Sequence, residues 1–160
     1  AVAVIDLKTS EVQATWKVDS HPTEILETAD GKTVFIACTN STSVHVIERQ
    51  TGKTLEVIKA ALFPNADLGN TPNSIALSAD GKALAIANAD NNNLALIDIA
   101  EPGKSRSLGF IPVGWYPTSV RFDRSGRILV TNGKGLMSKA NRGAISGKQV
   151  HSSSRIRIRR

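Results

Sequence analysis

Two stretches carry residue types that bind phosphate or metal ions in other proteins, and the first lacks the spacing that this chemistry needs. The segment GAISGKQ (143–149) has three residues between its glycines where a phosphate-binding loop has four, and Gln149 replaces the Ser or Thr that binds Mg²⁺. Metal-assisted phosphoester hydrolysis needs several Asp and His ligands around its ions. The only histidines are His21, His45 and His151. We therefore expect no catalytic residue, no metal site and no cofactor.

The second stretch is the Asn-rich segment NADNNN (88–93), in which Asn88, Asp90 and Asn92 are candidate binding residues. Its side-chain and backbone oxygens are ligands that Ca²⁺ accepts, but it lacks the acidic residues and spacing of a calcium loop. Asn and Asp also favour the backbone of turns, so a solvated turn is the alternative. Trp115 and Tyr116 leave a similar choice, between stacking on a ligand and packing under a junction of sheets.

An internal repeat positions these residues. Three prolines align, and each is followed nine residues later by a glycine: HPTEILETADGKTVFIAC (21–38), TPNSIALSADGKALAIAN (71–88) and YPTSVRFDRSGRILVTN (116–132). Third apolar runs follow at 43–48 and 93–99 and occur alone at 1–7, and fourth runs close the units at 11–18, 54–60 and 107–113. Four short strands at a period of 50 and then 45 residues predict the four-stranded blades of a β-propeller.

The local chemistry agrees with strands. Ala-Asp-Gly-Lys at 29–32 and 79–82 is typical of tight turns. The second strands, such as VFIA (34–37) and LAIA (84–87), are apolar on both faces, which indicates sheets covered on both sides. We predict an all-β fold of antiparallel four-stranded propeller blades, about three to four blades in number and not closed. It spans residues 1–138, with repeats near 21–60, 71–113 and 116–136 and trailing strands at 1–18.

This topology predicts which end of the blades binds a ligand. In an up-and-down blade the compact turns between strands 1 and 2 and between strands 3 and 4 share one end, and the irregular loops share the other. Because binding residues concentrate on loops that a rigid scaffold holds, we expect a ligand at the loop end. The candidates there are His21, Asn88, Asp90, Asn92, Trp115, Tyr116, Asn132 and Lys134. His21 varies to Thr71 and Tyr116 between copies, which favours a surface residue.

Two side chains differ from their counterparts in the other copies. Glu27 stands where the other copies have Leu77 and Phe122, and His45 stands where they have Ala3 and Ala95. First strands line the central channel of a propeller, so Glu27 is a candidate to face it and to meet a ligand or a cation. The alternative is that a truncated blade or local water accommodates the carboxylate without any role.

Charge and cysteine content limit which other functions are possible. Residues 139–160 hold seven of the 20 basic residues and no acid, so the first 138 residues carry 13 basic and 14 acidic side chains, a net charge of −1. The basicity therefore belongs to a tail, which we expect to be disordered, with an exposed strand or a nucleic-acid arm as alternatives. The single Cys38 excludes an internal disulfide and is expected to be buried in a strand. No apolar run is long enough to cross a bilayer, and no signal peptide is visible.

The repeat also resembles a known family. The segments FIACTNSTSVHVIERQTGK and AIANADNNNLALIDI, with their preceding turns, look like the YVTN-family β-propeller repeats of secreted bacterial and archaeal proteins. Residues 61–136 resemble the propeller half of bifunctional proteins that join YVTN repeats to a C-terminal phosphoesterase domain related to alkaline phosphatase. The resemblance covers residues 1 to about 141 and departs from the family after GKGLMSKAN. It implies a secreted or periplasmic parent protein.

Two functions follow as expectations. The first is a non-catalytic binding and scaffold module that presents loops to a protein, a glycan or a small ligand. The alternative is the propeller portion of a bifunctional phosphoesterase whose catalytic domain lies outside this chain. We find neither the site residues of a propeller lactonase nor a basic face for specific nucleic-acid binding on the repeats. Incomplete closure leaves strand edges unpaired, so we also expect self-association.

Overall fold

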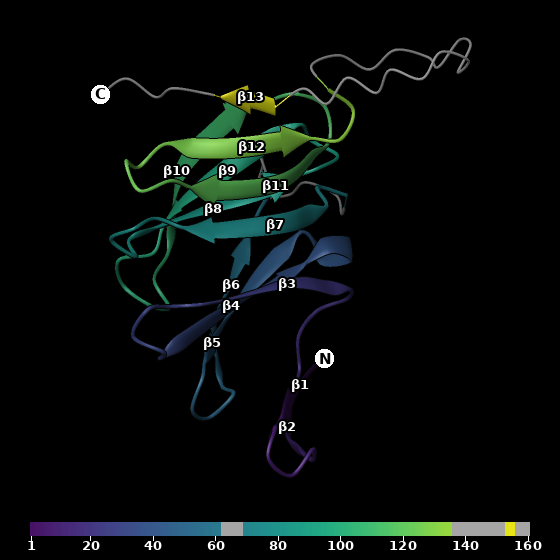
Figure 1. Cartoon of the computed structure of the whole chain (residues 1–160), viewed down its shortest axis with the longest axis vertical. Coiled ribbons are helices and arrows are strands. Elements are labelled where there is room, and N and C mark those ends of the chain that lie inside the picture. Colours follow the sequence, from purple (N-terminus) through teal and green to yellow (C-terminus); the bar gives the residue numbers. More distant parts are fainter. Residues whose placement is uncertain (62–68, 136–152, 156–160) are drawn as a thin grey trace, which may run out of the picture.

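The computed structural model describes residues 1–61 and 69–135, and the backbone of 153–155. Its strands form four antiparallel sheets that lie side by side in a row (Figure 1). We name the sheets blades A to D in chain order. Blade A contains β1 (Val2–Ile5) and β2 (Val12–Trp16); blade B contains β3 (Pro22–Glu27), β4 (Thr33–Cys38), β5 (Ser43–Glu48) and β6 (Thr54–Lys59); blade C contains β7 (Pro72–Leu77), β8 (Ala83–Asn88), β9 (Asn93–Asp98) and β10 (Arg106–Pro112); blade D contains β11 (Pro117–Phe122), β12 (Ile128–Asn132) and β13 (Ser153–Arg155).

Blades B and C have the predicted order of strands 1 to 4 and nearly the same register. Ile36 of β4 pairs with His45 of β5, and Ile86 of β8 pairs with Ala95 of β9 at the equivalent position. Blade A holds only the third and fourth strands of a blade, and it lies at the opposite end of the row from blade D (Figure 1). The prediction of four-stranded propeller blades that do not close is confirmed.

The turn between the first and second strands is built the same way in blades B and C, whereas in blade D the carboxylate of Asp123 and the hydroxyl of Ser125 exchange places. In blade C the Asp80 carboxylate accepts hydrogen bonds from the Ser78 hydroxyl, at 2.6 Å, and from the Lys82 N–H, at 3.1 Å. The Ser78 hydroxyl holds the pKa of Asp80 below its ordinary value. Gly81 has φ +68°, a left-handed backbone that glycine adopts without steric cost. These local bonds explain why the Ala-Asp-Gly-Lys pattern predicts a tight turn.

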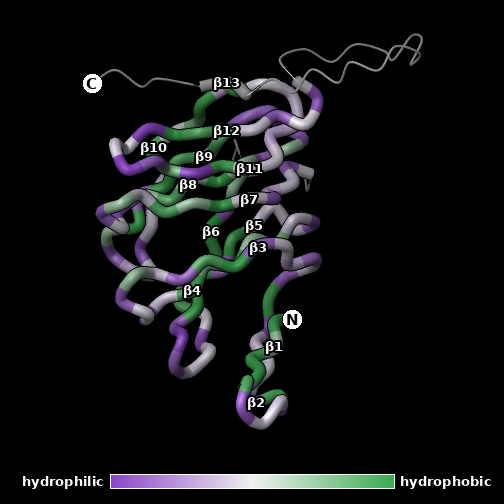
Figure 2. Tube along the Cα trace, viewed as in Figure 1, coloured by the Kyte–Doolittle hydropathy of each residue, from purple (hydrophilic) through white to green (hydrophobic). Residues whose placement is uncertain are grey.

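The core lies in the layers between blades. The layer between blades B and C includes Phe35 and Val46 from one side and Ile75 and Ile86 from the other, and a second layer joins blades C and D. β4 and β8 are buried almost throughout, because each lies between two apolar layers. Figure 2 shows the hydrophobic strands alternating with hydrophilic turns. Cys38 is fully buried, as expected, and burial raises the pKa of its thiol.

Blade A packs on blade B through Val2, Trp16 and Val18. The indole of Trp16 lies directly over Gly52, so that a Cβ on this glycine would come within 2.3 Å of the ring. Gly52 also has φ +71°. The turn between β5 and β6 therefore requires glycine for its backbone and for the approach of Trp16.

We expect Gly52→Ala to lower the free energy of unfolding by about 2 kcal/mol, because the new methyl group adds a clash with Trp16 to the cost of a left-handed backbone. Gly81→Ala is the matched control: Gly81 has a similar φ of +68° but nothing within 4 Å of its added Cβ, so about 1 kcal/mol should be lost. Urea denaturation of both variants measures the difference. Equal losses would show that Trp16 does not occupy this position.

The basic tail is described only in part. β13 pairs with β12 through three residues, with Ser154 opposite Val130, and lies at the far edge of blade D. The rest of the predicted disordered segment 139–160 lies outside the described residues, and so do the whole phosphate-loop-like segment 143–149 and most of the 60–71 insertion.

Candidate functional site

A cleft of about 860 Å³ opens between blades B and C. Its walls come from the first strands β3 and β7, from the turns that follow them, and from residues 99–103 and 105 after β9. Thr33, Phe35, Val46 and Glu56 of blade B and Arg121 and Phe122 of β11 complete the lining. The cleft lies at the end of the blades that carries the compact turns, opposite the loop end that the sequence favours for a ligand.

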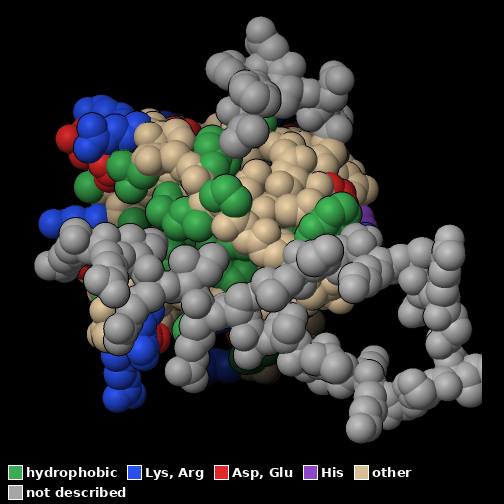
Figure 3. Space-filling model, turned by 90° about the horizontal axis from the view of Figure 1, so that it is seen from above, with side chains coloured by type: hydrophobic (Ala, Val, Ile, Leu, Met, Phe, Trp, Pro, Cys, Tyr) green, Lys and Arg blue, Asp and Glu red, His purple; other side chains and the backbone are tan. Residues whose placement is uncertain are grey.

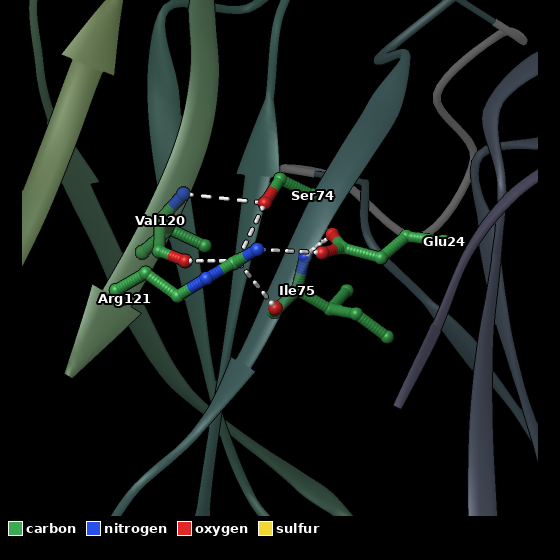
Figure 4. Close-up of polar contacts among 5 residues, drawn as sticks. All are labelled: Glu24, Ser74, Ile75, Val120 and Arg121. Atoms are coloured by element: carbon green, nitrogen blue, oxygen red, sulfur yellow. Dashed lines mark hydrogen bonds and ion pairs between the residues drawn. The ribbon is translucent and has the colours of Figure 1, made fainter. Parts of the chain in front are cut away.

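Glu24 is the central polar residue of this cleft. Its Oε2 accepts the backbone N–H of Ile75 in blade C at 2.5 Å, and its Oε1 accepts an Nη2 hydrogen of Arg121 in blade D at 3.1 Å (Figure 4). The Glu24 side chain is 22% exposed and that of Arg121 is 57% exposed. One carboxylate therefore links the first strands of three consecutive blades.

The repeat explains part of this arrangement. Ser74 occupies the position of Glu24 in the next copy, and its hydroxyl accepts the N–H of Val120 in blade D at 3.2 Å. At the junction of blades B and C and at the junction of blades C and D, a side-chain oxygen at this position thus accepts a backbone N–H of the following blade. The longer side chain of Glu24 also reaches the guanidinium of Arg121, which stands where the other copies have Leu26 and Ala76.

Arg121 is held by several acceptors at once. Its Nη1 donates to the carbonyl oxygen of Val120 at 2.6 Å, to the Ser74 hydroxyl at 3.3 Å and to the carbonyl oxygen of Ile75 at 3.4 Å (Figure 4). These bonds fix the guanidinium beside Glu24. Sequence reasoning missed both residues, although each differs from its counterparts in the other copies just as Glu27 and His45 do.

The lining of the cleft is strongly acidic. Among the described residues it contains one basic side chain, Arg121, and the carboxylates of Glu24, Glu27, Asp30, Glu56, Asp80 and Glu101. Four of these carboxylates are paired with basic side chains: Glu24 with Arg121, Glu27 with Arg49, Asp30 with Lys32 and Glu101 with Lys104. Glu56 accepts the N–H and the hydroxyl of Ser105, at 3.1 Å and 2.6 Å. Within the described part of the chain, Glu56 and Asp80 form no ion pair with a basic side chain. Two carboxylates of the lining are therefore held by hydrogen bonds and form no direct ion pair among the described residues.

Glu27, the candidate to face a central channel, lies on the wall of this cleft. It forms an ion pair of 2.7 Å with Arg49, and its side chain is 47% exposed. His45 is nearly buried under the segment that joins blades A and B, where its Nε2 lies 3.2 Å from an Asp19 carboxylate oxygen. The hydroxyl of Ser43 donates to the same carboxylate at 2.7 Å and lowers the pKa of Asp19 below its ordinary value.

The Asn-rich segment forms a network of amide side chains. Asn88 is fully buried, and its Nδ2 donates to the carbonyl oxygen of Ala60 at 2.9 Å and to Oδ1 of Asn93 at 3.0 Å. Asn91 donates to Asn70, whose own Nδ2 reaches the same carbonyl of Ala60 at 3.0 Å. These side chains join the loop of blade C to the segment that precedes its first strand. Residues 89–92 form a turn in which Asp90 and Asn91 are exposed, as the turn interpretation predicts, and the buried Asn88 and Asn93 anchor it.

Of two further candidates at the loop end, one connects two blades and the other bonds within blade C. Asn92 accepts the Tyr116 N–H with its Oδ1 at 2.8 Å, so it joins blade C to the start of blade D. Asp90 accepts a hydrogen bond from the Thr71 hydroxyl. His21, Thr71 and Tyr116 occupy the same position of the repeat and have φ values of +59°, +53° and +58°. The residue before each proline thus has a left-handed backbone whatever its side chain.

The remaining candidates cluster at the start and end of blade D. The ammonium group of Lys134 lies 4.7 Å from the centre of the Tyr116 ring, and Trp115 is 45% exposed. The side chain of Asn132 lies close to Gly114, and the exposed His21 contacts Asn40 at 3.5 Å. The structure therefore brings Trp115, Tyr116, Asn132 and Lys134 together and leaves His21 apart from them. Binding at these residues stays a prediction.

The described residues contain neither a cluster of metal ligands nor a membrane-spanning helix. Among residues 1–61 and 69–135, no three His, Cys, Asp or Glu side chains lie close enough to hold a metal ion together. The same residues include no helix that is long and apolar enough to span a membrane.

Comparison with known proteins gives no match to any family model. Two curated proteins of Staphylococcus epidermidis, both uncharacterised, are 29% identical over 139 residues, which is 83% of this chain and 41% of theirs. The chain thus spans well under half the length of the curated relatives that it matches.

Solved structures resemble the chain more clearly. A periplasmic gluconolactonase of Pseudomonas aeruginosa superposes with a TM-score of 0.62 at 26% identity, over 72% of this chain and 34% of that one. A protein of Lactobacillus plantarum gives 0.63 at 25% identity, over 69% and 34%. A set of WD40 repeats gives 0.61 at 20% identity, over 72% and 33%, and supports the fold alone. This chain is therefore part of a β-propeller, and about a third of each of these larger proteins corresponds to it.

Proposed function

We propose that the chain is a non-catalytic binding module of a β-propeller protein, and that a positively charged segment of a protein partner binds in the cleft between blades B and C. The cleft itself is the observation that carries this proposal. Its volume of about 860 Å³ is in the range of pockets that hold ligands. Its end of the blades is also formed by short, hydrogen-bonded turns, so the site is preformed.

The charge of the lining favours a cationic ligand. Four of the six carboxylates in the lining are paired with basic side chains, which leaves Glu56 and Asp80 to attract a cation. Acidic groups in a recess concentrate the field that attracts cations. The chain as a whole has a net charge of +6. The overall charge of the chain therefore repels a polycation, whereas the cleft attracts it. Binding of a polycation is for this reason a specific test of the cleft.

Fluorescence anisotropy with fluorescein-labelled octalysine tests the proposal. We expect saturable binding that Glu56→Gln together with Asp80→Asn weakens by about tenfold, or 1.4 kcal/mol. Glu11→Gln together with Glu48→Gln is the matched control, because it removes the same charge from residues outside the lining. Absence of octalysine binding to the wild-type chain, or equal weakening in both double variants, would overturn the proposal and leave a glycan or an uncharged small ligand to be tested.

The length of the matched proteins favours a second candidate, in which the chain is one portion of a larger propeller enzyme. The chain covers 41% of its curated relatives and 34% of the gluconolactonase. The sequence resemblance favours a phosphoesterase parent of the YVTN type, and the names of the structural neighbours favour a lactonase. In either case we expect the isolated chain to hydrolyse neither p-nitrophenyl phosphate with added Mn²⁺ or Zn²⁺ nor δ-gluconolactone. Turnover above the background rate would contradict a non-catalytic chain.

The same resemblance supports a secreted or periplasmic location for the parent protein. Immunoblotting of fractionated cells with an antibody against this chain tests this proposal. A signal confined to the cytoplasmic fraction would contradict it.

A further inference from the structure

The cleft between blades B and C has an apolar floor beneath its acidic rim. Phe35 and Val46 of blade B and Ile75 and Ile99 of blade C line it and are buried in one core layer. Both blades have all four of their strands, so both walls of the cleft come from complete sheets. The shape of this floor therefore follows from the packing of two whole blades.

Two leucines of the lining keep part of their surface exposed. Leu26 of β3 and Leu77 of β7 pack against this core layer from opposite blades, and both are only partly buried. Apolar surface that a ligand removes from water contributes to the free energy of binding in proportion to its area. The two leucines therefore offer a contact that the charges of the rim do not provide.

The unpaired carboxylates are fixed relative to this apolar surface. Asp80 lies on the tight turn that follows β7, three residues after Leu77, and the Ser78 hydroxyl holds its carboxylate. Glu56 is held from the other side of the cleft by two hydrogen bonds from Ser105. Figure 3 shows charged side chains on the left, at the end of the blades that carries the compact turns, with hydrophobic side chains close to them.

We propose that the segment bound in the cleft carries a large apolar side chain among its basic residues. The apolar side chain packs against Leu26 and Leu77, while a neighbouring Lys or Arg pairs with Glu56 or Asp80. A purely basic segment would leave the leucines in contact with water. An aromatic residue suits the position, because it buries a large area with few rotatable bonds. This inference rests on the function proposed above and specifies the partner's chemistry.

Two fluorescein-labelled peptides, KKKFKKKK and KKKSKKKK, test the apolar residue by fluorescence anisotropy. They have the same length and the same charge and differ at one residue. KKKFKKKK should bind about tenfold more tightly, because burial of a large apolar side chain is sufficient for this gain in affinity. Equal saturable binding of both peptides would overturn the apolar contact alone, whereas absence of binding by either would also overturn the proposed function.

Leu26→Ala together with Leu77→Ala locates the contact. This double variant should reduce the advantage of KKKFKKKK to less than about threefold, and it should bind KKKSKKKK as the wild-type chain does. Leu7→Ala together with Leu108→Ala is the matched control, because both leucines are exposed and lie outside the lining. An advantage that survives the first pair of substitutions, or that both pairs reduce equally, would overturn the proposal.

Methyl NMR of the wild-type chain tests the same contact without any substitution. KKKFKKKK should shift the methyl signals of Leu26 and Leu77 and KKKSKKKK should not, since the ring current of a phenyl group acts on the methyl groups that it contacts. Shifts specific to KKKFKKKK that are largest at leucines outside the lining would place the apolar side chain elsewhere and would overturn the proposal.

Discussion

Glu24→Ala is expected to lower the free energy of unfolding by about 3 kcal/mol. The variant leaves the N–H of the fully buried Ile75 without the acceptor that now lies 2.5 Å away, and an unsatisfied buried donor costs about 1–3 kcal/mol. It also removes the ion pair that joins blade B to Arg121 of blade D. Urea denaturation followed by circular dichroism measures the loss.

Glu24→Ser separates the two effects. Serine is the residue that accepts the equivalent N–H at Ser74, at 3.2 Å from Val120, so it should restore the acceptor for Ile75 but not the ion pair. Because Arg121 is more than half exposed, its pair should contribute little, and Glu24→Ser should retain most of the wild-type stability. Equal losses for the two variants would contradict an acceptor role at this position.

Asn88→Ala is expected to cost about 3 kcal/mol as well, because it removes two hydrogen bonds from a fully buried position, leaves Oδ1 of Asn93 without this donor, and opens a cavity. Thermal or urea unfolding measures the loss. Addition of Ca²⁺ to the wild-type chain distinguishes a structural amide network from a calcium loop. Only a calcium loop would make the unfolding temperature depend on added Ca²⁺.

Asp90→Ala is the control for this prediction. Asp90 belongs to the same segment but is exposed and bonds only to Thr71 among the described residues, so its loss should cost well under 1 kcal/mol. A large effect of Asp90→Ala, or stabilisation of the wild-type chain by Ca²⁺, would restore the interpretation of residues 88–93 as a cation site.

The sequence predicts the strands well because three copies of the repeat show the same pattern independently. The proline, the glycine of the turn and the apolar second strand recur in register, and each recurrence corresponds to an element of a blade. The same comparison contains the signal for Glu24 and Arg121, since Ser74 and Ser119 match the first position and Leu26 and Ala76 match the second. The sequence comparison singled out Glu27 on this strand, whereas Glu24 is the residue that bonds across the junction between blades B and C.

Other features depend on packing that no single copy contains. Asn88 is buried because it meets the carbonyl oxygen of Ala60, 28 residues earlier in the chain, and the insertion that includes Ala60 has no counterpart in the other copies. The cleft likewise forms where the turns of blade C face β3 of blade B. Its acidic residues are spread over five segments of the sequence, so their proximity follows only from the way the blades pack.

Mapping of octalysine on the chain by backbone amide chemical shifts tests most directly where the module binds. We expect the largest shifts at residues 77–81, 100–103 and 105, which line the cleft between blades B and C. Largest shifts at residues 88–93, 114–116 and 132–135 would place the site at the opposite, loop end of the blades and would contradict binding in the cleft.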